Sequence, residues 1–130
     1  MIFLDTGFLF AFYCADDGRH SEAAELMKAI VSKEHGAAHV SDYVVDELAS
    51  LVFSKAGKAK AVDVARNVLG SFEVIYMDRI AFGEAVSLFE KEASLSFTDC
   101  STLVLMKRHG IKLLATFDSG FRGKVKTAGI

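Results

Sequence analysis

The sequence has no apolar run long enough to cross a membrane, which takes roughly 20 consecutive apolar residues. Its most apolar segment, MIFLDTGFLFAFYC, is interrupted at Asp5 and followed closely by Asp16 and Asp17. The segment also lacks the basic leader and the small-residue cleavage pattern of a secretory signal. We therefore expect a buried strand and a short helix here, in a cytoplasmic protein without membrane contact.

Metal-binding patterns of cysteine and histidine are also missing. The two cysteines, Cys14 and Cys100, form no metal or redox spacing motif, so we expect reduced thiols. The histidines are scattered along the chain, which argues against a zinc site and favours structural or surface roles: His20, His35, His39 and His109.

Low-complexity tracts are absent, and the composition is that of a folded protein. The chain has 130 residues, of which 52% are hydrophobic and 25% charged. That length fits one compact domain over residues 1–130 and leaves no room for a separate substrate module.

The net charge of −2 hides an uneven distribution. Residues 1–53 carry nine acids against three bases, whereas residues 107–130 carry six bases against one acid. A nearly balanced total argues against a protein that coats nucleic acid non-specifically. A basic arm beside an acidic pocket is compatible with a phosphodiester substrate held by its backbone.

Short apolar runs alternate with longer segments of helical periodicity. We predict strands at 2–4, 37–40, 72–76 and 112–116, with a short fifth strand in the tail from Lys124. We predict a short helix after the first strand and further helices at 20–34, 42–54, 57–69, 79–92 and 98–109, with Ser41 as a cap and stops at Gly70 and Gly110. The apolar side of the 20–34 helix would comprise Ala23, Leu26, Met27, Ile30 and Val31. This alternation predicts an α/β fold: a three-layer α/β/α sandwich with a central, mainly parallel sheet of four to five strands.

Two acids follow predicted strands directly. Asp5 comes after the 2–4 strand and Asp118 after the 112–116 strand. Ligands of open parallel sheets bind beyond the carboxyl ends of the strands, so both acids are candidates for a site there. A helix N-cap is the alternative role for Asp5, and a turn residue is the alternative for Asp118.

Two further acids are placed by helical phase, at about 100° per residue. In the 42–54 helix we expect Asp46 to be solvated and Glu47 to flank an apolar stripe of Val44, Leu48, Leu51 and Val52. Asp99 shares a face with Leu103 and Met106, which points it inward. Its alternative role is to complement the helix dipole in the first turn.

Several carboxylates brought together raise one another's pKa, so their clustering destabilises a fold unless a cation is present. Oxygen ligands of this kind suit hard divalent cations, and Mg²⁺ or Mn²⁺ is the expected cofactor.

Four segments in order give the chain a family resemblance: FLDTGFLFAF, DDGRHSEAAEL, SDYVVDELASLV and LSFTDCSTLVLMKRHGIKLLATFDSGF. Together they resemble the PIN-domain ribonucleases, in particular the VapC-type toxins of type II toxin–antitoxin systems. The resemblance runs nearly end to end and includes the trailing Phe121. It departs from the family pattern at Cys100, which takes the place of the usual small residue after the third acid.

The resemblance implies a PIN-like fold and hydrolysis of RNA phosphodiester bonds. Asp5, Glu47, Asp99 and Asp118 would be the catalytic and metal-binding quartet. The hydroxyls of Thr6 and Thr116 would orient ligands or water. Ser119 is a weaker candidate for the same role, and the alternative for its hydroxyl is a bond to nearby turn backbone.

The resemblance also implies protein partners. A cognate antitoxin would place an Arg- or Lys-bearing segment in the acidic site and a helix in an apolar groove. A homodimer is expected as well. Aromatic residues available for such a groove or dimer face, with core packing as their alternative, are Phe8, Phe10, Phe12 and Phe53.

Candidate contacts to the RNA backbone are the bases that we expect near the carboxyl edge of the sheet: Arg19, Lys55, Lys58, Arg122 and Lys124. Each could instead be a solvated surface charge.

Two other functions remain open at this point. One is a PIN-like RNA-processing nuclease without an antitoxin. The other is a non-catalytic, magnesium-binding α/β signalling module, which would carry paired acids after its first strand and a lysine after a late strand. Here Asp5 stands alone, and the late strand ends in Thr116-Phe117-Asp118.

Overall fold

The computed structural model describes residues 1–130 and contains one five-stranded sheet, in which every paired strand is parallel. The strand order is β3-β2-β1-β4-β5. The strands are β1 (Ile2–Leu4), β2 (Ala38–Ser41), β3 (Glu73–Ile75), β4 (Leu113–Ala115) and β5 (Lys126–Ala128). The helices are α1 (Thr6–Tyr13), α2 (His20–Val31), α3 (Asp42–Ala56), α4 (Lys58–Ser71), α5 (Arg79–Lys91) and α6 (Phe97–Arg108), with a 3₁₀ turn at Ser119–Phe121.

β1 lies at the centre of the sheet, and all three of its residues are buried. A parallel strand covered on both faces has to be apolar throughout, which explains the uninterrupted run IFL. β1 pairs with β4 so that Leu4 lies opposite Ala115. Asp5 and Thr116 therefore leave the sheet side by side, although most of the chain separates them.

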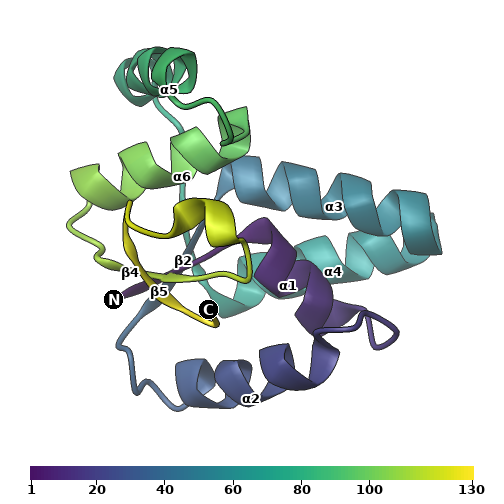
Figure 1. The fold of residues 1–130 in the computed structure, drawn as a ribbon. Coiled ribbons are helices and arrows are strands. Elements are labelled where there is room, and N and C mark those ends of the chain that lie inside the picture. Colours follow the sequence, from purple (N-terminus) through teal and green to yellow (C-terminus); the bar gives the residue numbers. More distant parts are fainter.

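Helices cover both faces of the sheet, as Figure 1 shows: α2 lies on one side, and α6, with α5 outside it, lies on the other. α3 and α4 run next to each other as a hairpin. This arrangement confirms the predicted α/β sandwich, with five strands in its sheet. The largest wholly buried side chains include Phe3, Phe8, Phe121, Leu4 and Leu114.

Several predicted helix ends are confirmed. Ser41 caps α3, where its Oγ accepts a hydrogen bond from the backbone N–H of Val44 at 3.1 Å. Gly110 follows α6 with a φ of 67°, a left-handed conformation that glycine adopts without strain.

The predicted end of the 57–69 helix near Gly70 is confirmed, since α4 ends one residue later, at Ser71. Its start differs by one residue: Gly57 lies outside the helix, alone separates α3 from α4, and has a φ of 89° and a ψ of 175°.

Two apolar positions predicted to be buried are exposed. Val31 is 66% exposed, because α2 packs through Ala23, Met27 and Ile30 and this last helical residue lies beside that stripe. Leu51 is 43% exposed, because its side of α3 borders an open cleft.

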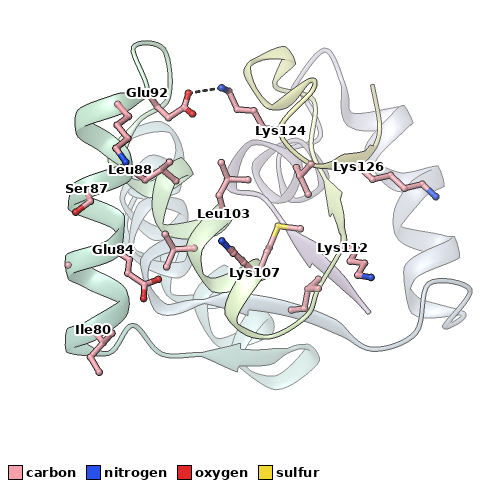
Figure 2. A pocket seen from close by; sticks show the side chains of 16 residues that line it. Ile80, Glu84, Ser87, Leu88, Glu92, Leu103, Lys107, Lys112, Lys124 and Lys126 are labelled. Atoms are coloured by element: carbon pink, nitrogen blue, oxygen red, sulfur yellow. Dashed lines mark hydrogen bonds and ion pairs between the residues drawn. The ribbon is translucent and has the colours of Figure 1, made fainter.

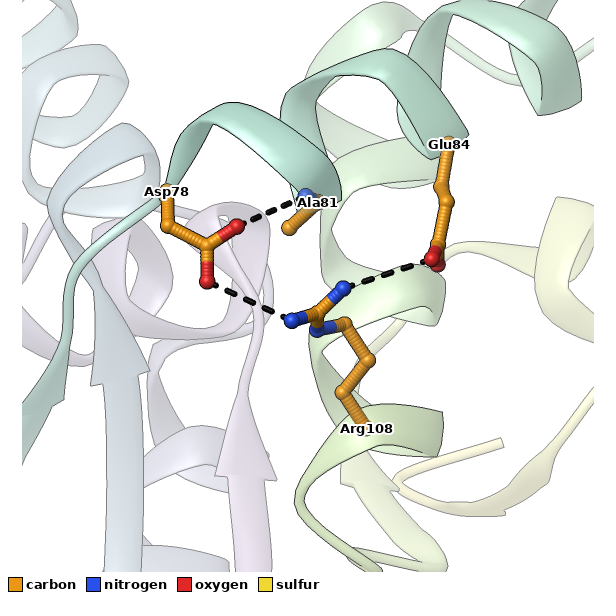
Figure 3. A network of polar contacts seen from close by, with 4 residues as sticks. All are labelled: Asp78, Ala81, Glu84 and Arg108. Carbon is orange, nitrogen blue, oxygen red and sulfur yellow. Dashed lines mark hydrogen bonds and ion pairs between the residues drawn. The ribbon is translucent and has the colours of Figure 1, made fainter.

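α5 is packed lightly, since only Ala81 and Ala85 of its residues are buried. A polar network reinforces its first turn (Figure 3). Asp78 caps the helix by accepting from the backbone N–H of Ala81 at 2.8 Å, which lowers the pKa of Asp78, with the nearby Arg108 charge contributing less. Arg108, from α6, pairs with Asp78 at 3.4 Å and with Glu84 at 3.3 Å. α5 is thus joined to α6 by small side chains, by charge and by the rings of Phe82 and Phe89, which contact Phe97 of α6.

The two helix-associated glycines should respond oppositely to alanine. Gly57→Ala would force a side chain into a backbone region that is essentially reserved for glycine, so we expect it to lower the free energy of unfolding by about 1–3 kcal/mol. Gly70→Ala fills open space inside a helix and should raise that free energy by about 0.5–1 kcal/mol. Urea unfolding of both variants measures the difference. Destabilisation by Gly70→Ala would contradict the continuous α4.

Candidate active site

The four predicted acids line one cleft at the carboxyl edge of the sheet. Asp5 follows β1, Asp118 lies just beyond β4, Glu47 comes from α3, and Asp99 lies in the first turn of α6. All four border the same cavity, of about 450 Å³. Four carboxylates from separate parts of the chain therefore face the same open cleft.

Asp5 is the most deeply placed of the four, with 5% of its surface exposed. The Thr116 hydroxyl donates a hydrogen bond to its Oδ2 at 2.7 Å. Asp5 occupies the N-cap position of α1, but its side chain makes no capping hydrogen bond. Capping therefore does not account for an aspartate here.

The pKa of Asp5 is raised from its ordinary value of 3.8 to about 7. Burial is the main cause, because it disfavours the charged form. The hydrogen bond from Thr116 opposes the shift, whereas the charges of Asp99 and Asp118 add to it. Without a cation, the charged form of Asp5 is therefore destabilised in this cleft.

Asp99 serves its helix and also faces the cleft. Its Oδ2 accepts from the backbone N–H of Ser96 at 3.1 Å, and the Ser96 Oγ accepts from the Asp99 N–H at 3.1 Å, which completes a capping box. Burial raises the pKa of Asp99, and the charges of Asp118 and Glu47 add to that rise. Asp99 thus stabilises the first turn of α6, which is the role expected as an alternative, and it also lines the cleft.

Asp118 is exposed and also has a structural bond. Its Oδ1 accepts from the backbone N–H of Gly120 at 2.8 Å, which caps the 3₁₀ turn. Its own N–H donates to the Thr116 Oγ1 at 3.0 Å. The Thr116 hydroxyl therefore links the side chain of Asp5 to the backbone of Asp118.

Helical phase correctly separated the two adjacent acids Asp46 and Glu47 of α3. Asp46 is exposed and does not border the cleft, whereas Glu47 is half-buried and does.

The donor atoms of the cleft suit a hard cation. Carboxylates and hydroxyls line it, and no histidine or cysteine does. Thr6 is buried at its edge, and the Thr6 Oγ1 has no hydrogen-bond partner, so a polar ligand is missing there. No three of the acids lie close enough together to enclose an ion by themselves. Such spacing is compatible with magnesium, which keeps several of its waters.

Of the predicted basic contacts, only Arg19 lines the cleft. Its guanidinium carbon lies 5.1 Å from the centre of the Phe117 ring, and its Nη1 pairs with Glu22 at 3.3 Å. The cleft lining does not include the other predicted bases or two of the three hydroxyl candidates: Lys55, Lys58, Arg122, Lys124, Thr116 and Ser119. Thr116 is wholly buried and reaches the site only through its hydrogen bond to Asp5.

Sequence reasoning missed six residues that border the cleft: Gly7, Ala11, Asp17, Leu51, Ser96 and Phe117. Asp17 shapes the loop before α2, where its Oδ1 accepts from the backbone N–H of Arg19 at 2.8 Å. The sequence signal that could have indicated Asp17 is its position two residues before Arg19, a candidate for binding phosphate.

Comparison with known proteins places the chain in a family. The model of the PIN domain matches residues 2–126. The chain belongs to the PIN-domain family. None of its helices combines the length and apolarity needed to span a bilayer.

Individual relatives are similar along most of their length. A VapC ribonuclease of Archaeoglobus fulgidus is 26% identical over 121 residues, which cover 91% of this chain and 77% of that protein. The crystal structure of VapC20 from Mycobacterium tuberculosis, a sarcin-ricin loop cleaving toxin, superposes with a TM-score of 0.86 at 22% identity, covering 100% of this chain and 98% of that one. A toxin–antitoxin complex from Klebsiella pneumoniae gives a TM-score of 0.71 at 17% identity, covering 98% and 96%.

The raised pKa of Asp5 predicts how the stability of the metal-free protein depends on pH. Between about pH 4 and 7 the folded chain keeps a proton that the unfolded chain has released, so the free energy of unfolding falls as pH rises and levels off above 7. The loss should be on the order of 4 kcal/mol. Asp5→Asn should remove most of this slope, leaving a smaller part from Asp99, whose pKa is also raised, and should be more stable than the wild type at pH 7.

Denaturant unfolding in chelator across this pH range tests the prediction. Asp46→Asn is the matched control, because Asp46 is exposed and outside the cleft. An Asp5→Asn protein that keeps the wild-type slope would contradict the assignment of the buried charge.

Proposed function

We propose that the protein is a divalent-metal-dependent endoribonuclease and the toxin of a toxin–antitoxin pair. The observation that carries this proposal is the convergence of Asp5, Glu47, Asp99 and Asp118 on one cleft in a PIN-domain chain. The similarity to a VapC ribonuclease supports RNA as the substrate. The expected site of action is the cytoplasm.

The four acids would hold Mg²⁺ or Mn²⁺, which when bound polarises the scissile phosphate and lowers the pKa of an attacking water. Thr116 fixes the orientation of the Asp5 carboxylate by donating to one of its two oxygens. The unpartnered Thr6 hydroxyl is free to bind water or a phosphate oxygen. Asp99 or Asp118 would position the attacking water.

Arg19 is the base best placed to hold the RNA backbone, since it lines the cleft with the acids. The other candidate bases would contact the RNA strand where it extends beyond the cleft. Two of them have other contacts: Lys124 pairs with Glu92 at 2.6 Å, and Lys58 lies 4.4 Å from the centre of the Phe53 ring.

An antitoxin would have two features to occupy. One is the acidic cleft, which attracts an Arg or Lys side chain. The other is an apolar hollow of about 370 Å³ between α1, α2 and α4, lined in part by Phe12, Tyr13, Val31 and Phe72. The exposure of Val31, unfavourable in an isolated chain, supports a helix packing there.

A homodimer would use the outer face of α5. Phe82, Val86 and Phe89 are 43%, 46% and 47% exposed, and their i, i+4, i+7 spacing puts them on one side of the helix. The Phe82 and Phe89 rings also contact the Phe97 ring, at 5.4 and 5.7 Å between centroids, which holds them in place. A preformed apolar stripe of this kind suits a second copy of the same stripe.

Cleavage of a structured RNA pool tests the nuclease. Wild-type protein free of antitoxin should cleave in Mg²⁺ or Mn²⁺ and not in chelator. Glu47→Gln should lower the rate by about 100-fold or more, which is a loss of roughly 3 kcal/mol of transition-state stabilisation. The double variant Asp5→Asn/Asp99→Asn should be inactive.

Asp46→Asn is the matched control for Glu47→Gln, because it removes a charge from the adjacent, solvated position of α3. Equal rates for Glu47→Gln and wild type would refute the four-acid site. Metal-induced thermal stabilisation without any cleavage would favour the non-catalytic magnesium-binding module. Cleavage by a protein whose gene has no small antitoxin gene beside it would favour an RNA-processing nuclease.

The dimer can be tested separately by light scattering. Val86→Glu places a charge at the centre of the α5 stripe and should convert the dimer to a monomer, since an unpaired buried charge is strongly unfavourable. Val62→Glu, at an exposed apolar position of α4, should leave the dimer intact. A wild-type protein that is monomeric at high concentration would exclude this assembly.

A further inference from the structure

The largest hollow on the molecule lies away from the acidic cleft. It is a groove of about 1000 Å³ between α5, α6 and the segment that leads into and forms β5 (Figure 2). It shares no lining residue with the cleft. The first turn of α6 borders the cleft through Asp99, and the later turns of the same helix border the groove.

The floor of the groove is aliphatic. Leu103 of α6 lies near its centre in Figure 2, with Leu88 of α5 to one side. Met106 of α6 and Val125 of the tail also line the groove. No aromatic side chain and no arginine lines it. Flat stacking surfaces for nucleotide bases are therefore missing, which separates this groove from the surfaces that bind single-stranded nucleic acid.

The rim of the groove carries an excess of positive charge. Five lysines line it: Lys91, Lys107, Lys112, Lys124 and Lys126. The two acids in the lining are already paired, Glu84 with Arg108 at 3.3 Å and Glu92 with Lys124 at 2.6 Å. The other four lysines have no acidic partner in the structure.

Ion pairs span the groove at both ends of α5. Arg108 joins the first turns of the helix to α6, and the Glu92–Lys124 pair connects the residue after the helix to the tail, across the upper end of the groove in Figure 2. These pairs join α5 to α6 and to the tail, so they hold the walls of the groove in place before a partner binds. Preorganised walls lose less entropy on binding.

We propose that this groove docks a helical segment of a protein partner in which aliphatic side chains are flanked by Asp and Glu. The aliphatic side chains would cover Leu88, Leu103 and Val125, which are partly exposed, and the acids would pair with the free lysines on the rim. Charge complementarity selects this occupant: a purely apolar helix would leave the four lysines without counter-charges. The inference does not depend on the nuclease, because the groove and the cleft are separate.

Binding of a synthetic helix tests the proposal. The probe is a fluorescein-labelled peptide with leucine at i, i+3, i+4 and i+7 and glutamate at the flanking positions, titrated with the full-length protein and followed by anisotropy. Lys107→Glu/Lys112→Glu should weaken its binding by about tenfold or more, because two attractive charges become repulsive. Lys28→Glu/Lys60→Glu, which reverses two lysines outside the groove, should change the affinity by less than about twofold.

A second probe separates the groove from simple charge attraction. The same peptide with serine in place of leucine keeps its net charge and should bind about tenfold more weakly if the aliphatic floor is used. Methyl shifts on binding should be confined to residues such as Leu103, Val104 and Met106, and absent from Val62 and Leu69 on α4.

Three results would overturn the proposal: no binding of the leucine peptide, equal binding of both peptides, or equal loss in the two charge-reversal variants. Preferential binding of a short single-stranded RNA, lost in Lys107→Glu/Lys112→Glu, would instead identify the groove as a nucleic-acid surface. Neither lysine lines the acidic cleft. The circular-dichroism spectrum and the thermal unfolding of this variant should match those of the wild type, which shows that it is folded.

Discussion

The hydrogen bond from the Thr116 hydroxyl to the Asp5 carboxylate ties together the ends of the two central strands, and the rest of the site depends on it. It joins residues 111 positions apart and is possible only because the chain crosses over the sheet to pair β4 with β1. The same hydroxyl accepts from the backbone of Asp118, so one threonine sets both the deepest acid and the turn that bears the outermost one. α3 and α6 then bring Glu47 and Asp99 to a position that this pair defines.

Like charges in one small volume work against the fold that holds them. Burial and mutual repulsion raise the pKa of Asp5 and of Asp99, and both acids are retained beside the best-packed part of the core. The charged acids thereby destabilise the fold locally, at a site where they would bind a cation, and such local destabilisation is common at functional sites. The lysine-rimmed groove carries the opposite charge farther along the same helix, α6. One helix thus separates a surface that attracts cations from one that attracts anions.

Local chemistry was enough to predict most of this arrangement. Because Asp5 and Asp118 follow apolar runs that predict strands, the sequence placed both at the carboxyl edge of the sheet. Helical phase placed Glu47 beside the apolar stripe of its helix and Asp46 on the solvated side. The failures are positions where distant packing decides. Leu51 has the phase of a core residue, but the part of the sandwich that it faces is a cleft. Gly57 was included in the predicted 57–69 helix, yet it alone separates α3 from α4 and has a positive φ. The groove could not be predicted, since its lining comes from separate segments that no local pattern relates.

The division of the site between segments far apart in the sequence has a consequence during synthesis. Asp5 leaves the ribosome 111 residues before Thr116, and β1 has no β4 to pair with until that segment is made. A growing chain, or one that ends before β4, therefore presents isolated acids and an unpaired central strand, not an assembled cleft. The acidic cleft forms only after the β4 segment has been made and has paired with β1.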